Sequence, residues 1–287
     1  MKKIISIALV VVMLTFTLVS LTGCFKADEN EGKVEYVQIK LTDEQYAYGV
    51  SKDDPELLAT VNRVLAELKE SGELDEIVNK YFSGDEENIK TFSAGTEDTS
   101  KNQLVVATNT PFSPFEYKKG DKFCGIDIEI AAIIAEEMGA ELVIKDMAFN
   151  AVLTAVETGK ADIVMAGLTV SPEREEQVTF SDTYYNASQV IITKKGDTTF
   201  ADCKTAADVE AVLNGMNKDT IIGYQNGTTG GLYVEGDADW GFDGFPVTAK
   251  GYDSAVSATQ ALVNGQIDFV VVDEGPAQII VKSVNNE

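Results

Sequence analysis

The sequence contains no histidine, and it has few cysteines and few basic residues. Without histidine, the chain cannot build a Ser-His-Asp triad, a Cys-His nucleophile or a His-ligated metal site. Three cysteines in 287 residues are too few for a disulfide scaffold. The 23 basic side chains are outnumbered by 47 acidic ones, which gives a net charge of −24. This charge excludes nucleic-acid binding through a general basic surface, because phosphate would be repelled.

The first 24 residues have the pattern of an export signal. Two lysines precede an apolar run over residues 4–19, and Leu21-Thr-Gly-Cys24 follows. This ending resembles a bacterial lipobox, which implies a lipoprotein signal peptide over residues 1–23, a lipid on Cys24 and a polar tether over residues 24–33. The alternative is an uncleaved anchor, since the apolar stretch is long enough to span a membrane. In both cases we expect the rest of the chain on the extracytoplasmic face of the bacterial cell membrane.

The remaining chain has a globular composition, with 44% hydrophobic residues. An early helix is predicted from Pro55, capped by Asp54 and ended by Gly72, and a second amphipathic helix follows it. Residues 83–103 are polar and read as a flexible linker. Strand and helix patterns then alternate, with Asp127 expected to cap one helix, to about residue 284. This alternation predicts an α/β protein in which helices cover both faces of parallel sheets.

Several motifs after residue 104 together resemble the extracellular solute-binding proteins of polar amino-acid ABC importers. They include Gly125-Ile-Asp-Ile-Glu129, Ala166-Gly-Leu-Thr-Val-Ser-Pro-Glu-Arg174, Gln225-Asn-Gly-Thr-Thr-Gly230 and Val271-Val-Asp-Glu274. Each motif alone is a weak signal, and the set is specific. The resemblance implies a two-lobed periplasmic-binding-protein fold (type II) with a hinge between the lobes.

The order of the segments differs from the order that is usual in this family. The family normally closes with a strand and two helices. This piece is expected after residue 287 but is found at residues 46–82 instead. The chain therefore resembles a circular permutant in which residues 83–103 join the ancestral termini. We expect lobe 1 over residues 42–192, and lobe 2 over residues 34–41 and 193–287. The alternative is an unrelated N-terminal helical hairpin.

The resemblance implies a ligand site between the lobes. Arg174 would hold the α-carboxylate of an amino acid through two parallel hydrogen bonds, Asp273 would pair with its α-ammonium group, and Phe112 and Phe149 would flank it. Asn109 stands where an aspartate is frequent, and this favours a neutral polar amino acid, such as glutamine, over a cationic one. The full set of ligand-binding residues implied is Asn109, Phe112, Phe149, Gly167, Leu168, Thr169, Arg174, Thr228, Thr229 and Asp273.

The leading hypothesis is thus a monomeric, non-enzymatic binding protein that delivers a polar amino acid to an ABC permease. No sequence motif calls for a metal or a cofactor. Two alternatives remain at this level: a cyclohexadienyl or arogenate dehydratase-like enzyme on the same fold, and a ligand-sensing module for a membrane receptor.

Overall fold

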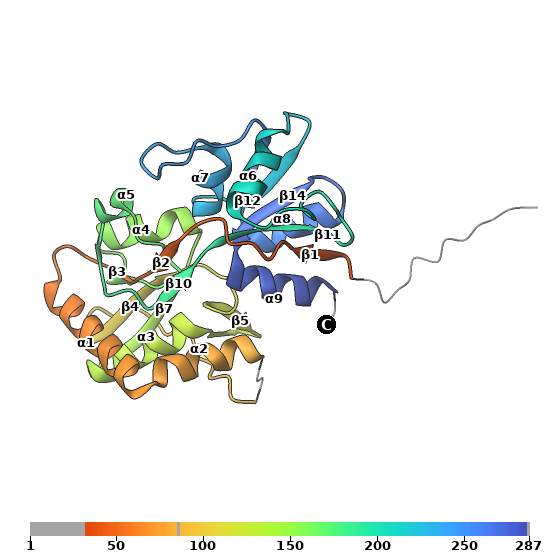
Figure 1. Cartoon of the computed structure of the whole chain (residues 1–287). Helices are drawn as coiled ribbons and strands as arrows, with labels where there is room; N and C mark the ends of the chain where they lie inside the picture. Colours follow the sequence, from red (N-terminus) through yellow and green to blue (C-terminus); the bar gives the residue numbers. More distant parts are fainter. Residues whose placement is uncertain (1–31, 85–86, 286–287) are drawn as a thin grey trace, which may run out of the picture. The chain divides into compact units, whose positions relative to one another are not determined.

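The computed structural model describes residues 32–84 and 87–285 (Figure 1). The predicted signal peptide, the predicted lipidation site at Cys24 and most of the predicted tether lie outside these residues. Within the described ranges, no helix has both the length and the apolar character needed to cross a membrane.

Two five-stranded sheets organise the chain. The first has the order β7-β4-β8-β3-β9 and the second has the order β1-β11-β14-β12-β13. The strands of the first sheet are β3 (Gly49–Val50), β4 (Gln103–Thr108), β7 (Glu141–Asp146), β8 (Ile163–Val164) and β9 (Thr179–Phe180). Those of the second are β1 (Val34–Tyr36), β11 (Gln189–Lys194), β12 (Ile221–Gln225), β13 (Thr248–Tyr252) and β14 (Phe269–Asp273). We refer to each sheet with its helices as a lobe, numbered in the same way.

The expectation of parallel sheets was wrong in part, because both sheets are mixed. In the first sheet β3 runs antiparallel to β8 and β9, and in the second β11 runs antiparallel to β1 and β14. Strands β3 and β11 are the ones that the chain enters directly from the other lobe, rather than through a helical crossover. Only βαβ units impose the parallel direction, and these two strands are not part of one.

Helices cover both faces of each sheet. In lobe 1, α1 (Pro55–Ser71), α2 (Glu73–Ser83) and α3 (Ile126–Glu137) share one core cluster, while α4 (Phe149–Glu157) packs in another. In lobe 2, one core cluster contains residues of α8 (Ala255–Val263) and α9 (Glu274–Asn285). A second cluster contains residues of α6 (Ala206–Asn214) and α7 (Thr229–Glu235). The short helix α5 (Pro172–Glu175) follows β8. The α/β class is therefore confirmed.

Residues 44–83 belong to the first lobe. Strand β3 is inserted between β8 and β9, and the side chains of α1 and α2 share a core with β4 and α3. Asp54 accepts a hydrogen bond from the backbone N–H of Leu57 at 2.9 Å, and Gly72 ends α1 in the left-handed conformation, as predicted. These residues are thus an integral part of the fold that continues from residue 103, not a separate helical hairpin.

The chain passes between the lobes twice within the described residues. The two crossing segments contain β2 (Glu44–Tyr46) and β10 (Tyr185–Ala187), which pair antiparallel with each other. This small ribbon is the direct connection between the sheets, since β2 leads from β1 to β3 and β10 leads from β9 to β11. Such a pair of adjacent connections is suited to hinge motion.

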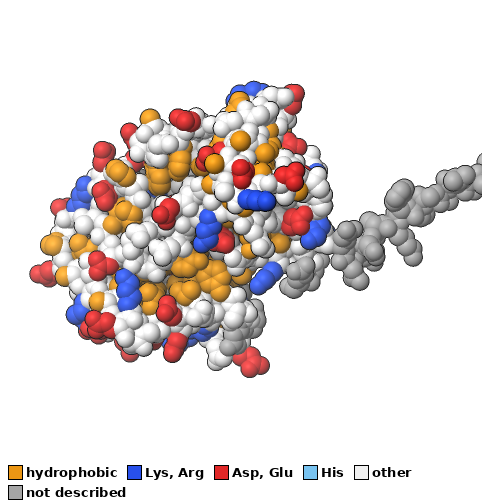
Figure 2. Space-filling model, in the orientation of Figure 1, with side chains coloured by type: hydrophobic (Ala, Val, Ile, Leu, Met, Phe, Trp, Pro, Cys, Tyr) orange, Lys and Arg blue, Asp and Glu red, His pale blue; other side chains and the backbone are white. Residues whose placement is uncertain are grey.

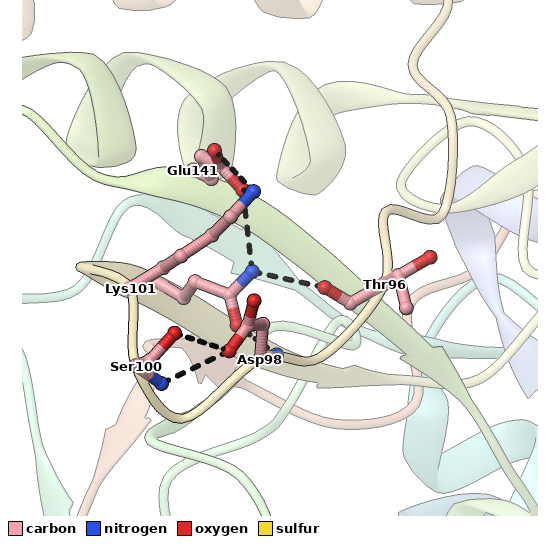
Figure 3. A network of polar contacts seen from close by, with 6 residues as sticks. Thr96, Asp98, Ser100, Lys101 and Glu141 are labelled. Atoms are coloured by element: carbon pink, nitrogen blue, oxygen red, sulfur yellow. Dashed lines mark hydrogen bonds and ion pairs between the residues drawn. The ribbon is translucent and has the colours of Figure 1, made fainter.

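Residues 87–103 are packed, which corrects the expectation of a flexible linker. Phe92 exchanges two backbone hydrogen bonds of 2.8 Å with Phe123, beside the hairpin of β5 (Tyr117–Lys119) and β6 (Lys122–Cys124). Ile144 donates a backbone hydrogen bond to Ala94 at 2.7 Å, and a polar network around Asp98, Lys101 and Glu141 follows (Figure 3). The few apolar residues of this segment cover an apolar cluster of lobe 1, so a mostly polar sequence still becomes fixed.

The surface reflects the composition. On the face shown in Figure 2, acidic side chains are spread over the surface, with basic ones among them. No broad basic area is visible on this face, in keeping with the excess of 47 acidic over 23 basic residues.

Candidate functional site

Arg174 is held by the loop and short helix that follow β8. Ser171 caps α5 by accepting a hydrogen bond from the backbone N–H of Arg174 at 3.1 Å. The side chain is 6% exposed, and its Nη1 donates to the carbonyl oxygen of Thr169 at 2.7 Å. Its Nη2 donates across to lobe 2, to the carbonyl oxygen of Gly227 at 3.2 Å. A guanidinium has five N–H donors, so the remaining N–H groups of Arg174 can bind a ligand carboxylate.

Burial lowers the pKa of Arg174, and the carboxylates of Glu44 and Asp273 oppose this shift. Arginine stays charged in proteins at physiological pH. The residue therefore places a permanent cation in a buried position, and a buried cation is favourable only where it is paired or hydrogen-bonded.

Asp273 lies at the carboxyl end of β14 in lobe 2 and is 6% exposed. Its Oδ1 accepts hydrogen bonds from the hydroxyl of Tyr46 at 2.6 Å and from Nε2 of Gln189 at 3.0 Å. Both bonds reach one oxygen, and Oδ2 can accept from a ligand ammonium group. Burial raises the pKa of Asp273 to about 7, the charge of Glu44 adds to this, and the bonds from Tyr46 and Gln189 act in the opposite direction.

Arg174 and Asp273 line the same cavity. Eight of the ten predicted residues line it, and Gln225 completes it: Phe112, Phe149, Gly167, Thr169, Arg174, Gln225, Thr228, Thr229 and Asp273. Its volume is about 10 Å³, close to the room that one water molecule requires. A free amino acid is much larger, so the lobes must part to admit one.

Asn109, the ninth predicted residue, lies behind the cavity in an amide pair with Gln225. Nε2 of Gln225 donates to Oδ1 of Asn109 at 2.7 Å, and Nδ2 of Asn109 donates to the carbonyl oxygen of Met147 at 2.6 Å. The pair joins the ends of β4 and β12, one from each lobe. Sequence reasoning assigned no role to Gln225, although its position at the carboxyl end of a strand was a usable signal.

Leu168, the tenth predicted residue, turns its side chain into the core of lobe 1 and is 1% exposed. Its carbonyl oxygen accepts from the backbone N–H of Ala47 at 3.1 Å. It supports the loop that carries Gly167 and Thr169, and its side chain does not line the cavity.

Gly167 allows the close approach of an aromatic ring. Its φ is +53°, and a Cβ atom there would lie 2.6 Å from the ring of Phe112. Its backbone N–H donates to Oδ2 of Asp127 at 2.9 Å. The prediction that Asp127 caps a helix was wrong: Gly125 occupies the N-cap of α3, and the Asp127 carboxylate is buried under Gly167 instead.

Thr169 and Glu44 form a contact that sequence reasoning missed. The hydroxyl of Thr169 donates to Oε2 of Glu44 at 2.7 Å, while Oε1 of Glu44 accepts from Thr42 at 2.6 Å and from Gln189 at 3.1 Å. The hydroxyl proton of Thr169 is thus directed at Glu44 in this structure. Glu44 is 5% exposed and lies on β2, in one of the two crossings between the lobes.

The two threonines sit at the start of α7. Thr228 is its N-cap residue and donates its hydroxyl to the carbonyl oxygen of Gln225 at 2.8 Å, and Thr229 is 2% exposed. Both line the cavity opposite Arg174, which comes from lobe 1. Together with the ribbon of β2 and β10, this arrangement defines a two-lobed protein with a polar cavity between the lobes.

The chain belongs to the bacterial extracellular solute-binding proteins of family 3. This family matches residues 6–84 and 104–232, more than half of the chain. The chain is similar to the arginine-binding extracellular protein ArtP of Bacillus subtilis (strain 168), with 42% identity over 103 residues, which are 36% of this chain and 40% of that protein. It is also similar to ABC transporter arginine-binding protein 1 of Escherichia coli (strain K12), with 33% identity over 187 residues, 64% of this chain and 68% of that protein.

A solved structure described as an ancestral arginine-binding protein bound to glutamine has a TM-score of 0.55 and 34% identity, over 65% of this chain and 76% of that one. This likeness shows the two-lobed periplasmic-binding-protein fold. The chain thus spans 40% of the first relative and about two thirds to three quarters of the others. The homologues are non-enzymatic binding proteins, which agrees with the expectation of a binding protein rather than a dehydratase.

Proposed function

We propose that this protein captures a polar amino acid between its lobes and delivers it to an ABC permease. The observation that carries the proposal is that a buried guanidinium, Arg174, and a buried carboxylate, Asp273, line one cavity from different lobes. An α-carboxylate and an α-ammonium group are complementary to these two charges. When the lobes close around a zwitterion, its two charged groups replace the water that Arg174 and Asp273 lose on burial.

The side-chain end of the cavity favours a planar group that can donate hydrogen bonds. Phe112 and Phe149 supply aromatic faces, and the amide of Gln225 lines the cavity with the amide of Asn109 paired behind it. A glutamine amide and an arginine guanidinium both have this shape. Asn109 carries no charge, which favours a neutral ligand such as glutamine. Arginine is the second candidate, because two relatives are named for it. Glutamine is also consistent with these relatives, because an ancestral arginine-binding protein was solved with glutamine bound.

The test is a thermal-shift panel over the twenty amino acids. A ligand at 100-fold its Kd stabilises the folded protein by about 2.7 kcal/mol, which gives a clear rise in Tm. We expect glutamine or arginine to give the largest shift. If no amino acid raises the Tm, the proposed function fails. If a hydrophobic amino acid gives the largest shift, the assignment of the side-chain end is wrong.

The charge of Asp273 predicts a pH dependence of binding. Because its pKa is raised to about 7, the carboxylate loses its charge as pH falls through this value, and the ligand ammonium then loses its partner. We expect the affinity to fall by about tenfold between pH 8 and pH 6, by linkage to one proton. The stability of the unliganded protein should instead fall as pH rises from about 4 to 7, since a buried carboxyl group with a raised pKa favours the folded state only while it is protonated. Calorimetric titration and thermal unfolding across this range check both trends, and equal affinity at pH 6 and pH 8 contradicts the first.

We further propose that the chain is a circular permutant of its family. Support comes from residues 44–83, which complete the first lobe, and from the two ends of the described chain, which are adjacent. Oδ1 of Asn285 accepts from the backbone N–H of Lys33 at 2.6 Å and of Val34 at 3.1 Å. On this proposal lobe 1 covers residues 42–192, and lobe 2 covers residues 34–41 and 193–287.

Restoring the usual order tests the permutation. A chain that starts near residue 87, continues to residue 285 and is then joined directly to residues 33–84 keeps the packed segment around Phe92 and should fold and bind the same ligand with similar affinity. Failure of this rearranged chain to fold would contradict the proposal. The proposed lipid on Cys24 is tested separately, because labelling with a radioactive fatty acid should mark the wild type and not Cys24→Ser.

A further inference from the structure

A hairpin from lobe 2 reaches Arg174 of lobe 1. Its two arms meet at Asp237 and Phe242, which form an isolated bridge with backbone hydrogen bonds of 2.8 and 2.9 Å. Oδ1 of Asp237 also accepts from the backbone N–H of Trp240 at 3.1 Å, which fixes the turn. The Phe242 ring packs edge-on against Tyr233 of α7 at 5.4 Å between centroids. The hairpin is therefore a built part of lobe 2 that presents Trp240.

The Trp240 ring lies on the guanidinium. Cζ of Arg174 is 5.5 Å from the Trp240 ring centroid and 5.6 Å from that of Phe149. The hydrogen bonds of a guanidinium lie in its plane, whereas rings contact its faces. Trp240 can therefore stay in place when a ligand carboxylate occupies the in-plane donors of Arg174.

The indole ring is held by packing alone. Its Nε1 is buried and makes no hydrogen bond to any described residue. The ring of Phe242, on the other arm of the hairpin, stacks on the indole ring with 6.1 Å between centroids. Because no indole hydrogen bond would be lost, phenylalanine at this position isolates the effect of the aromatic face.

We propose that the hairpin of residues 237–242 is the latch of the closed cleft, in which Trp240 of lobe 2 packs on Arg174 of lobe 1 and slows ligand release. This inference rests on the proposed function for the identity of the ligand. The contact bridges the two lobes at the residue that would hold the ligand carboxylate. Opening the cleft must break this contact, and the ligand leaves only after opening.

The kinetic test uses the amino acid that gives the largest thermal shift. Filter binding with this amino acid in radiolabelled form should give a dissociation rate about 2- to 30-fold higher for Trp240→Ala, the range that cation–π energies span. The association rate should change little, and Trp240→Phe should recover most of the slow release. An unchanged dissociation rate in Trp240→Ala, with normal thermal unfolding, overturns the latch while the proposed function stands.

A second test needs no ligand, so it holds even if no amino acid binds. Trp240 is the only tryptophan in the chain, so its emission reports on this contact alone. In the unliganded protein, acrylamide should quench Trp240 more strongly after Arg174→Ala, whereas Arg63→Ala, which removes an exposed arginine of α1, should leave quenching unchanged. Equal quenching in the wild type and Arg174→Ala overturns the contact that defines the latch.

Discussion

Replacing Arg174 with alanine is expected to lower the affinity for the amino acid by at least about 30-fold. Truncating one partner of a buried, hydrogen-bonded charge pair costs roughly 2–5 kcal/mol, because the other charge is left buried without its partner. Here the ligand carboxylate would lose its cation inside a cavity whose other charged lining residue is Asp273. Isothermal titration calorimetry measures the loss, and the thermal-shift response to the ligand should disappear with it.

Two further variants sharpen this prediction. Arg174→Lys keeps the charge but loses the planar fork, so its affinity should lie between those of the wild type and Arg174→Ala. Arg63→Ala is a matched control, because Arg63 is the other arginine of the chain and its 47% exposed side chain pairs with Glu67 and Glu137 on the surface. Affinity within twofold of the wild type in Arg174→Ala would remove this residue from the ligand site.

Replacing Asp273 with asparagine is the second change with a large expected effect. The substitution keeps the size of the side chain and an oxygen acceptor for Tyr46 and Gln189, but it removes the charge that would pair with the ligand ammonium. We expect at least about a tenfold loss of affinity at pH 8, together with loss of the pH dependence between pH 6 and pH 8. The unliganded protein should keep or gain stability at pH 8, since a buried carboxylate near Glu44 is removed.

Titrations of Asp273→Asn at several pH values check both parts of this prediction. Asp219→Asn serves as the control, because it removes an exposed acid from the same lobe and should leave affinity and pH dependence intact. A pH profile of Asp273→Asn that still follows that of the wild type would show that another group is responsible. Asp127 is then the first to consider, because burial raises its pKa to about 7 as well.

Local sequence signals predicted the elements well. Helix α1 starts after the predicted cap Asp54 with the predicted proline at its first position, and it ends at the predicted glycine, Gly72. Most of the predicted site residues also converge on one cavity, because motifs at strand ends meet once the sheets form. Whether these residues bind the ligand remains a prediction.

The features that sequence reasoning missed depend on distant partners. Asp127 could not be recognised as a support for Gly167, which follows it by 40 positions. Glu44 and Gln225 acquire their surroundings only when the two lobes come together. The packing of Phe92 on Phe123 was hidden for another reason: two or three apolar residues in a polar segment carry no periodic pattern, yet they are enough to fix it.

Calorimetric titration with altered head groups tests the central claim most directly. The amino acid that gives the largest thermal shift should be compared with its α-carboxamide, which lacks the carboxylate, and with its Nα-acetyl derivative, which lacks the ammonium group. If Arg174 and Asp273 hold the two ends of a zwitterion, each derivative should bind at least about 30-fold more weakly than the parent. If either derivative binds as tightly as the parent amino acid, the corresponding residue does not hold the ligand in this way.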